Sequence, residues 1–192
     1  MVLVHGRGAD EWDLLDLVEA LPEPCLYVSV RAPHPWTWGG YTWFGHRPDG
    51  TPDPQGFAQA RDALGRFLRG LPEAVPVDPE RLAVVGFSQG AALAAAVLLL
   101  PESGLRVAAA LSGFPDPNPG PGGPGRRAFV AHGTEDPVVP PLAGRRVRDQ
   151  LAARGVDVAY REYRVGHAVS PEELVDLAAW LREALALPAA DG

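Results

Sequence analysis

The sequence predicts an α/β fold in which a mainly parallel sheet of about six strands is covered by helices on both faces. Short apolar runs alternate with helical patterns along the chain, which is typical of parallel strands joined by right-handed crossovers. One apolar run, Leu82–Val85, passes through Gly-Phe-Ser-Gln-Gly at 86–90 into the strong helix formers of Ala91–Leu100. A length of 192 residues is enough for one domain with a full core, so a single domain over residues 1–192 is expected.

Composition narrows the classes of function. With 46% hydrophobic and 21% charged residues the chain is expected to be soluble and globular. A formal net charge of −7 disfavours a nucleic-acid partner or an acidic membrane surface, because no positive field attracts phosphates. The longest apolar run, Ala91–Leu100, is too short for stable membrane insertion, and the start shows no signal-peptide pattern. A cytoplasmic location is therefore expected, with Cys25 as a core thiol.

The first third of the chain is expected to hold two strands, two helices and a long loop. Met1–Val4 is expected to be a strand that begins at the first residue, so the lead-in strands usual in such a domain are missing, either because the edge of the sheet is trimmed or because the start of the sequence is placed too late. Asp10 is expected to cap a helix that Pro22 and Pro24 stop, followed by a strand over Cys25–Val30. Asp53-Pro54 begins a second helix, which Pro72 is expected to end.

Residues 31–50 are rich in Pro, Gly and aromatic residues, so they are expected to form a loop at the carboxyl end of a strand. We interpret Trp36, Trp38 and Trp43 as a wall of the substrate site, since pockets in open α/β sheets lie at that edge. The alternative is that these rings cap the core. Phe114, beside the breaker-rich surface loop at 115–125, is a further candidate for the acyl site.

The second half continues the alternation. Strands are expected over 106–111, 127–131 and 156–163, with a helix over 141–153. Ser170-Pro171-Glu172-Glu173 is a capping box with proline at the first helical position, so it predicts the start of the last helix.

Ser88 is the candidate nucleophile. A buried strand, a sharp turn with Gly86 and Gly90, and a helix start form the context of a nucleophile elbow, which exposes the serine hydroxyl at the carboxyl end of its strand. The amino terminus of the helix lies beneath that hydroxyl and favours developing negative charge. The alternative is an ordinary strand-to-helix turn.

A serine hydroxyl needs a base to take its proton and an acid to orient that base. In this architecture the order along the chain is serine, acid, histidine, and Ser88, Asp136 and His167 fulfil it. Glu135 is the alternative acid. The remaining histidines precede the acid and break the order; they are His5, His34, His46 and His132. Of these, His5 and His132 are interpreted as packing or turn residues.

Two backbone N–H groups are needed to bind the oxyanion, one from the residue after the nucleophile and one from the turn after the first strand. These are Gln89 and, within His5-Gly6-Arg7-Gly8, Arg7. The alternative for the second motif is a tight turn without a further role.

Six motifs together resemble the small α/β-hydrolases of the phospholipase/carboxylesterase family, which includes bacterial carboxylesterases and acyl-protein thioesterases. They are VHGRGAD at 4–10, RAPHPWTWGGYTWF at 31–44, GFSQG at 86–90, LSGF at 111–114, HGTEDPVVP at 132–140 and GHAVSPEEL at 166–174. The resemblance covers nearly the whole chain. It implies the α/β-hydrolase fold, a Ser88–Asp136–His167 triad, backbone donors at Arg7 and Gln89, no cofactor, and hydrolysis of carboxylic esters or thioesters. The chain departs from the family in its missing lead-in strands and in Arg7, where relatives often carry Leu.

The function predicted is that of a serine carboxylesterase that acts on small to medium esters through an acyl-enzyme. An acyl-thioesterase or lysophospholipase with the same triad is the alternative, followed by a non-catalytic binding protein of the hydrolase fold, which would be expected to lose a triad member. A metal hydrolase is disfavoured, because the chain has no HExxH motif and no clustered His and Cys ligands. The partners expected are a small ester and, as one option, a second copy of the chain in a homodimer.

Overall fold

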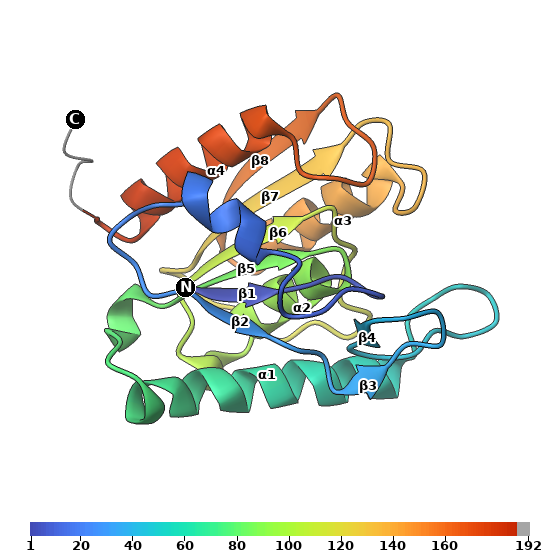
Figure 1. Cartoon of the computed structure of the whole chain (residues 1–192), viewed down its shortest axis with the longest axis horizontal. Helices are drawn as coiled ribbons and strands as arrows, with labels where there is room; N and C mark the ends of the chain where they lie inside the picture. The colour runs from blue at the N-terminus through green and yellow to red at the C-terminus, as the bar shows by residue number, and fades with distance from the viewer. Residues whose placement is uncertain (188–192) are drawn as a thin grey trace.

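The computed structural model describes residues 1–187 and builds them around one parallel sheet (Figure 1). Its strand order is β2-β1-β5-β6-β7-β8, and every neighbouring pair is parallel. The six strands are β1 (Val2–Val4), β2 (Val28–Val30), β5 (Ala83–Phe87), β6 (Val107–Leu111), β7 (Arg127–Gly133) and β8 (Asp157–Tyr163). A short antiparallel pair, β3 (His34–Pro35) and β4 (Tyr41–Thr42), lies outside this sheet.

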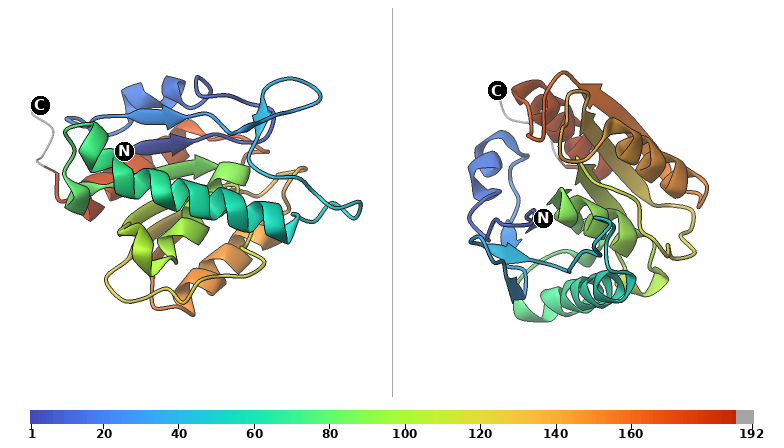
Figure 2. Two further views of the ribbon diagram at one scale, coloured as in Figure 1. Left: turned by 90° about the horizontal axis from the view of Figure 1, so that it is seen from below. Right: turned by 90° about the vertical axis from the view of Figure 1, so that its right-hand side faces the viewer.

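Helices cover both faces of the sheet, as predicted (Figure 2). Three helices share one face, namely α1 (Pro54–Ala74), α2 (Gln89–Leu98) and α3 (Pro141–Ala152). The other face carries α4 (Pro171–Ala184) and the 3-10 helix η1 (Leu15–Ala20), while the short 3-10 turns η2 (Pro79–Arg81) and η3 (Pro101–Ser103) lie in connections. None of the helices within residues 1–187 combines the length and the apolarity needed to cross a membrane.

The core consists of two layers, because successive strand residues point to opposite faces. In β5, Val84 packs into the layer beneath α1, α2 and α3, whereas Ala83 and Val85 pack into the layer beneath α4 and η1. All ten residues of α2 are buried, which explains why this helix has no polar face. The helix that follows Ser88 is thus held on all sides by the protein interior.

Three of the predicted elements differ from the structure for a clear physical reason, whereas the boundaries of the others move by about two residues or fewer. Asp10 accepts a hydrogen bond from the Trp12 N–H, 3.0 Å away, and closes a local turn, so the segment continues as turns and η1 instead of the predicted α-helix. Strand β2 covers Val28–Val30 and not Cys25–Val30, because its partner β1 supplies only three residues for pairing. Pro72 lies inside α1, which continues to Ala74 because the Val75 N–H still bonds to the Leu71 carbonyl.

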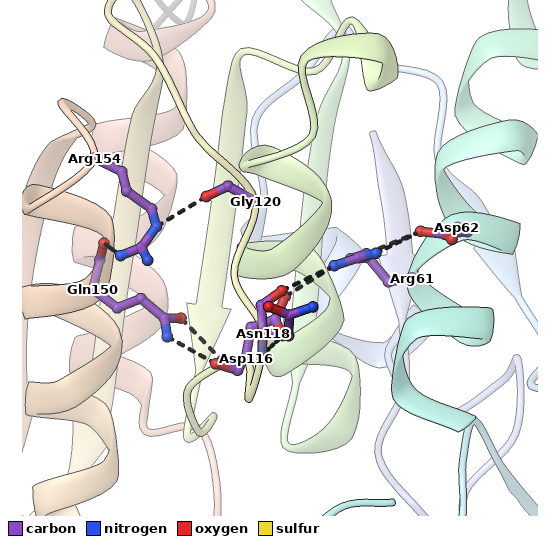
Figure 3. Close-up of polar contacts among 7 residues, drawn as sticks. All are labelled: Arg61, Asp62, Asp116, Asn118, Gly120, Gln150 and Arg154. Atoms are coloured by element: carbon purple, nitrogen blue, oxygen red, sulfur yellow. Dashed lines mark hydrogen bonds and ion pairs between the residues drawn. The ribbon is translucent and has the colours of Figure 1, made fainter. Parts of the chain in front are cut away.

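The Pro- and Gly-rich segment 115–125 has no helix or strand and is held by side chains from α1, from α3 and from the turn that follows α3 (Figure 3). Gln150 bonds to both the N–H and the carbonyl of Asp116, at 3.1 and 2.9 Å, and Arg154 donates to the Gly120 carbonyl at 2.9 Å. Arg61 lies 3.5 Å from the buried Asp116 carboxylate, whose pKa is raised by burial. These contacts fix the segment that follows Phe114 at the carboxyl edge of the sheet.

Candidate active site

Ser88 occupies a strained turn between β5 and α2. Its φ of 54° and ψ of −113° are rare for a residue with a side chain. The turn closes because two glycines have no Cβ: one added at Gly86 would lie 2.2 Å from the Gly90 carbonyl oxygen, and one added at Gly90 would lie 1.9 Å from the Val4 carbonyl oxygen. This is the geometry of a nucleophile elbow.

His167 connects Ser88 to Asp136. It lies in the turn between β8 and α4, with Nε2 3.1 Å from the Ser88 Oγ and Nδ1 2.7 Å from the Asp136 Oδ2. A carboxylate only accepts hydrogen bonds, so the imidazole proton is on Nδ1 and Nε2 is free to accept from the serine hydroxyl. The imidazole also packs against the Phe87 ring, at 4.8 Å between centroids.

Asp136 is held in place by its own loop after β7. Its Oδ1 accepts hydrogen bonds from the N–H groups of Val138 and Val139, at 2.8 and 2.9 Å, and its side chain is fully buried. Burial acts to raise the pKa of Asp136, but the hydrogen bonds from His167 and the two N–H groups outweigh it and keep the pKa below its ordinary value. The carboxylate is therefore ionised at neutral pH.

The alternative acid, Glu135, is directed elsewhere. Its carboxylate is exposed and pairs with Arg164 at 2.9 Å. The buried His132, by contrast, supports the Asp136 loop: its Nε2 lies 2.8 Å from the Val139 carbonyl oxygen and 3.5 Å from the Asp136 Oδ2. Of the two adjacent acids, the structure brings only Asp136 to the histidine.

Arg7 and Gln89, the predicted oxyanion donors, line the same pocket as Ser88. Among residues 1–187 neither N–H donates to a protein acceptor, so both are free for a ligand. Gln89 is the first residue of α2, where the helix dipole favours an anion.

The turn that carries Arg7 is fixed from both sides. The buried His5 bonds through Nδ1 to its neighbour Gly6 at 2.6 Å and accepts at Nε2 from the Ala32 N–H at 3.0 Å. Burial lowers the pKa of His5, which keeps the ring neutral, as this pair of bonds requires. Trp43 adds a hydrogen bond from Nε1 to the His5 carbonyl at 2.8 Å.

The Gln89 side chain has a role that the sequence reasoning missed. Its Oε1 accepts from the Thr42 hydroxyl and the Trp43 N–H, at 3.0 and 3.1 Å, and its Nε2 donates to the Phe44 carbonyl at 3.0 Å. The amide thus joins residues 36–44, the aromatic segment, to the elbow. The only signal in the sequence was one polar residue at the start of a wholly apolar helix.

A pocket of about 460 Å³ opens at Ser88 and Gln89. Phe114 and Val138 give it apolar walls, whereas Trp36, Trp38 and Trp43 are not among its lining residues.

The prediction of a tryptophan wall therefore does not match the structure. Trp43 is 7% exposed and belongs to the core, Trp38 is 83% exposed, and Trp36 lies beneath the Arg7 guanidinium, 5.0 Å from its ring centre. The segment that carries these rings does reach the site, because His46 and Gly50 line the pocket, but none of the three rings does. A smaller cavity of about 170 Å³, between Met1, Cys25 and Leu185, lies at the opposite edge.

The profile of the phospholipase/carboxylesterase family matches residues 1–185. The chain belongs to the phospholipase/carboxylesterase family. A curated relative from Candida albicans, acyl-protein thioesterase 1, is 28% identical over 209 residues and covers 95% of this chain and 90% of the relative.

Solved structures agree with this family assignment at the level of the fold. The Bacillus cereus carboxylesterase superposes with a TM-score of 0.86 at 23% identity, over 95% of this chain and 87% of its own. Esterase PE8 superposes with a TM-score of 0.82 at 29% identity, over 95% and 91%. The predicted α/β-hydrolase fold, with its six-stranded parallel sheet, is confirmed.

Metal ligands are not gathered at this site or elsewhere in residues 1–187: no group of three or more His, Cys, Asp and Glu side chains could hold an ion there.

Proposed function

We propose that this member of the phospholipase/carboxylesterase family is a serine carboxylesterase that hydrolyses small to medium esters through an acyl-enzyme. The observation that carries the proposal is the unbroken hydrogen-bonded chain from Ser88 through His167 to the buried Asp136. The chain starts at a strained elbow beside two unpaired backbone donors. That combination activates a serine hydroxyl as a nucleophile.

In the proposed reaction, His167 Nε2 takes the Ser88 proton as Oγ attacks the ester carbonyl carbon. The carbonyl oxygen becomes an oxyanion, which the N–H groups of Arg7 and Gln89 stabilise. The imidazolium, held by Asp136, then protonates the departing alcohol, and the acyl group remains on Oγ. A water molecule, deprotonated by His167, attacks the acyl carbon and releases the acid and free Ser88.

Thioesters are the second candidate substrates. The curated relative from Candida albicans is named an acyl-protein thioesterase, and the same attack on a carbonyl carbon expels a thiol instead of an alcohol. A lysophospholipase activity would use the same triad on a longer acyl chain. The pocket of about 460 Å³, open and lined by Phe114 and Val138, favours a small or medium acyl group over a long one. The cytoplasmic location, the single domain and the homodimer stay predictions.

The test combines labelling with a substrate series. A serine-directed phosphonate is expected to modify Ser88 in the wild-type protein, and Ser88→Ala is expected to remain folded with neither a label nor an acyl-enzyme burst. Aryl esters and acyl thioesters of graded chain length then separate the two activities. A label that persists in Ser88→Ala would place the nucleophile elsewhere and refute the proposal.

A further inference from the structure

The pocket at Ser88 contains an excess of positive charge. Arg7 and Arg146 both line it, together with His46, and none of its lining residues within 1–187 is an aspartate or a glutamate. The chain as a whole carries a formal net charge of −7, so two arginines without an acid in one pocket run against the average of the molecule.

Arg146 is distinguished from its neighbours on α3. Arg145 pairs with Glu162 at 2.7 Å, and Arg148 pairs with Asp149 at 2.8 Å. Within the described part of the chain, Arg146 has neither an ion pair nor a hydrogen bond, and it is the α3 arginine that borders the pocket. The charge on the pocket side of the helix is therefore left for a ligand or for solvent.

Arg7 is positioned, but its charge is not neutralised. Its guanidinium lies over the Trp36 ring, and one nitrogen lies 3.3 Å from the His46 Nδ1. Burial, and then the Arg7 charge, lower the pKa of His46, so this imidazole is a neutral acceptor. A guanidinium has five N–H donors, and in residues 1–187 the contact to His46 is the one polar contact this side chain makes. A fixed, forked cation in this state suits a carboxylate.

We propose that Arg7 and Arg146 select esters or thioesters that carry a carboxylate in addition to the bond that is cleaved. The inference rests on the proposed function and specifies its substrate class. The carboxylate binds the two guanidinium groups while Ser88 attacks the ester carbonyl, and hydrolysis consumes one water and releases an alcohol or thiol and a second acid group. Arg7 contributes to both parts of the site, through its backbone N–H to the oxyanion and through its side chain to specificity.

The experiment compares matched substrates that differ only in charge. Monoethyl succinate and ethyl succinamate place the carboxylate, or a neutral amide of the same shape, on the acyl side. The pair 4-acetoxybenzoate and 4-acetoxybenzamide does the same on the alcohol side. In one of the two pairs, the wild-type protein is expected to favour the carboxylate by about tenfold in kcat/KM at low ionic strength, as for a charge-assisted hydrogen bond. The ratio is expected to fall in 0.5 M KCl because the pocket is open to screening ions.

The variants identify the residues responsible. Arg7→Gln and Arg146→Gln are each expected to lower the charged-to-neutral ratio, and the double variant is expected to bring it close to one. Arg148→Gln is the matched control, since it lies on the same helix and changes the net charge equally, and it is expected to keep the wild-type ratio. A ratio that survives in the double variant, or that falls equally in Arg148→Gln, would overturn the assignment.

Two wild-type measurements keep the inference testable if a variant fails to fold. Succinate is expected to inhibit hydrolysis of the neutral esters more strongly than succinamide, and the difference is expected to shrink with salt. Equal inhibition and a ratio of one in both substrate pairs would refute the substrate class while leaving esterase activity and the Ser88 label intact. Failure of the proposed function itself would be seen differently, as a loss of label and of hydrolysis for the neutral esters as well.

Discussion

Asp136 uses both carboxylate oxygens, one toward His167 and one toward two N–H groups of its own loop. The second set of bonds fixes the carboxylate before any substrate binds. The imidazole consequently meets an acid whose position and ionisation are already set, and the hydrogen bond to Nδ1 determines which nitrogen faces Ser88.

We expect Asp136→Asn to lower kcat by up to about 10⁴-fold with little change in substrate binding, because an amide at this position favours the wrong imidazole tautomer. Steady-state kinetics on a short aryl ester measure this loss. Glu135→Gln is the matched control and is expected to have wild-type kinetics, since Glu135 pairs with Arg164 at the surface. A loss below tenfold in Asp136→Asn would assign the acid role to another residue.

At the scale of elements, the aromatic segment, residues 36–44, supports the site from outside, since none of its residues lines the pocket. Its backbone pairs with the first turn, through the Gly8 N–H to the Tyr41 carbonyl at 2.8 Å and the Tyr41 N–H to the Ala9 carbonyl at 2.8 Å. A Cβ at Gly40 would lie 2.2 Å from the Gly8 carbonyl oxygen, so only glycine permits this approach. The segment therefore holds the turn that carries Arg7 in place.

Trp43 and Trp38 are therefore expected to differ in their contribution to the stability of the fold. Trp43→Ala is expected to cost about 3–5 kcal/mol of unfolding free energy, because it removes a buried indole and its bond to His5. Trp38→Ala is expected to change the unfolding free energy by less than about 0.5 kcal/mol, since its ring is exposed. Urea denaturation measures both values.

Phe114→Ala completes this comparison, because Phe114 lines the pocket. It is expected to alter the kcat/KM ratio between short and medium acyl esters, which Trp38→Ala leaves unchanged. A chain-length profile that responds to Trp38 and not to Phe114 would restore the tryptophan wall.

The sequence predicted that the three site residues lie close together but not how the tryptophan rings are oriented, for a physical reason. Ser88, Asp136 and His167 each follow a predicted strand, and parallel strands bring the residues after them to one edge of the sheet, so their proximity could be predicted. The placement of Trp43 depends on the hydrogen bonds of its ring to His5 and of its backbone N–H to Gln89, which lie 38 and 46 residues away. Neither composition nor periodicity contains that information. The 3-10 geometry after Asp10 depends likewise on a competition between a local turn and a helix that propensity does not decide.

At the scale of the whole molecule, the stability of the fold is linked to pH through Glu173. This residue caps α4 but is almost completely buried, and burial raises the pKa of its carboxyl to about 7. One of its oxygens, Oε1, has no hydrogen-bond partner in the described part of the chain. The folded state thus holds the proton more tightly than the unfolded state, in which the carboxyl titrates near 4.5.

Because the folded pKa is raised, the stability that Glu173 contributes is fully present below about pH 4.5 and is lost as pH rises toward 7. We expect Glu173→Gln, which stays neutral, to be more stable than the wild type at pH 8 by up to about 3 kcal/mol and to match it near pH 4. Denaturation curves at pH 4, 6, 7 and 8 measure the difference. Glu172→Gln, an exposed change on the same helix, is the control, and parallel wild-type and Glu173→Gln profiles would contradict the linkage.

The meeting point of Val4, Gly86 and Gly90 has a consequence for how such a site diversifies. There the chain packs backbone against backbone, with no room for a single added carbon. The spacing of the two proposed oxyanion donors is therefore a property of peptide geometry, independent of the side chain that position 7 carries. Mutation at that position is free to alter which molecules are accepted without disturbing the bond-breaking apparatus. Selection can accordingly act on substrate specificity and on the catalytic step separately, although Arg7 contributes to both, through its side chain and through its backbone N–H.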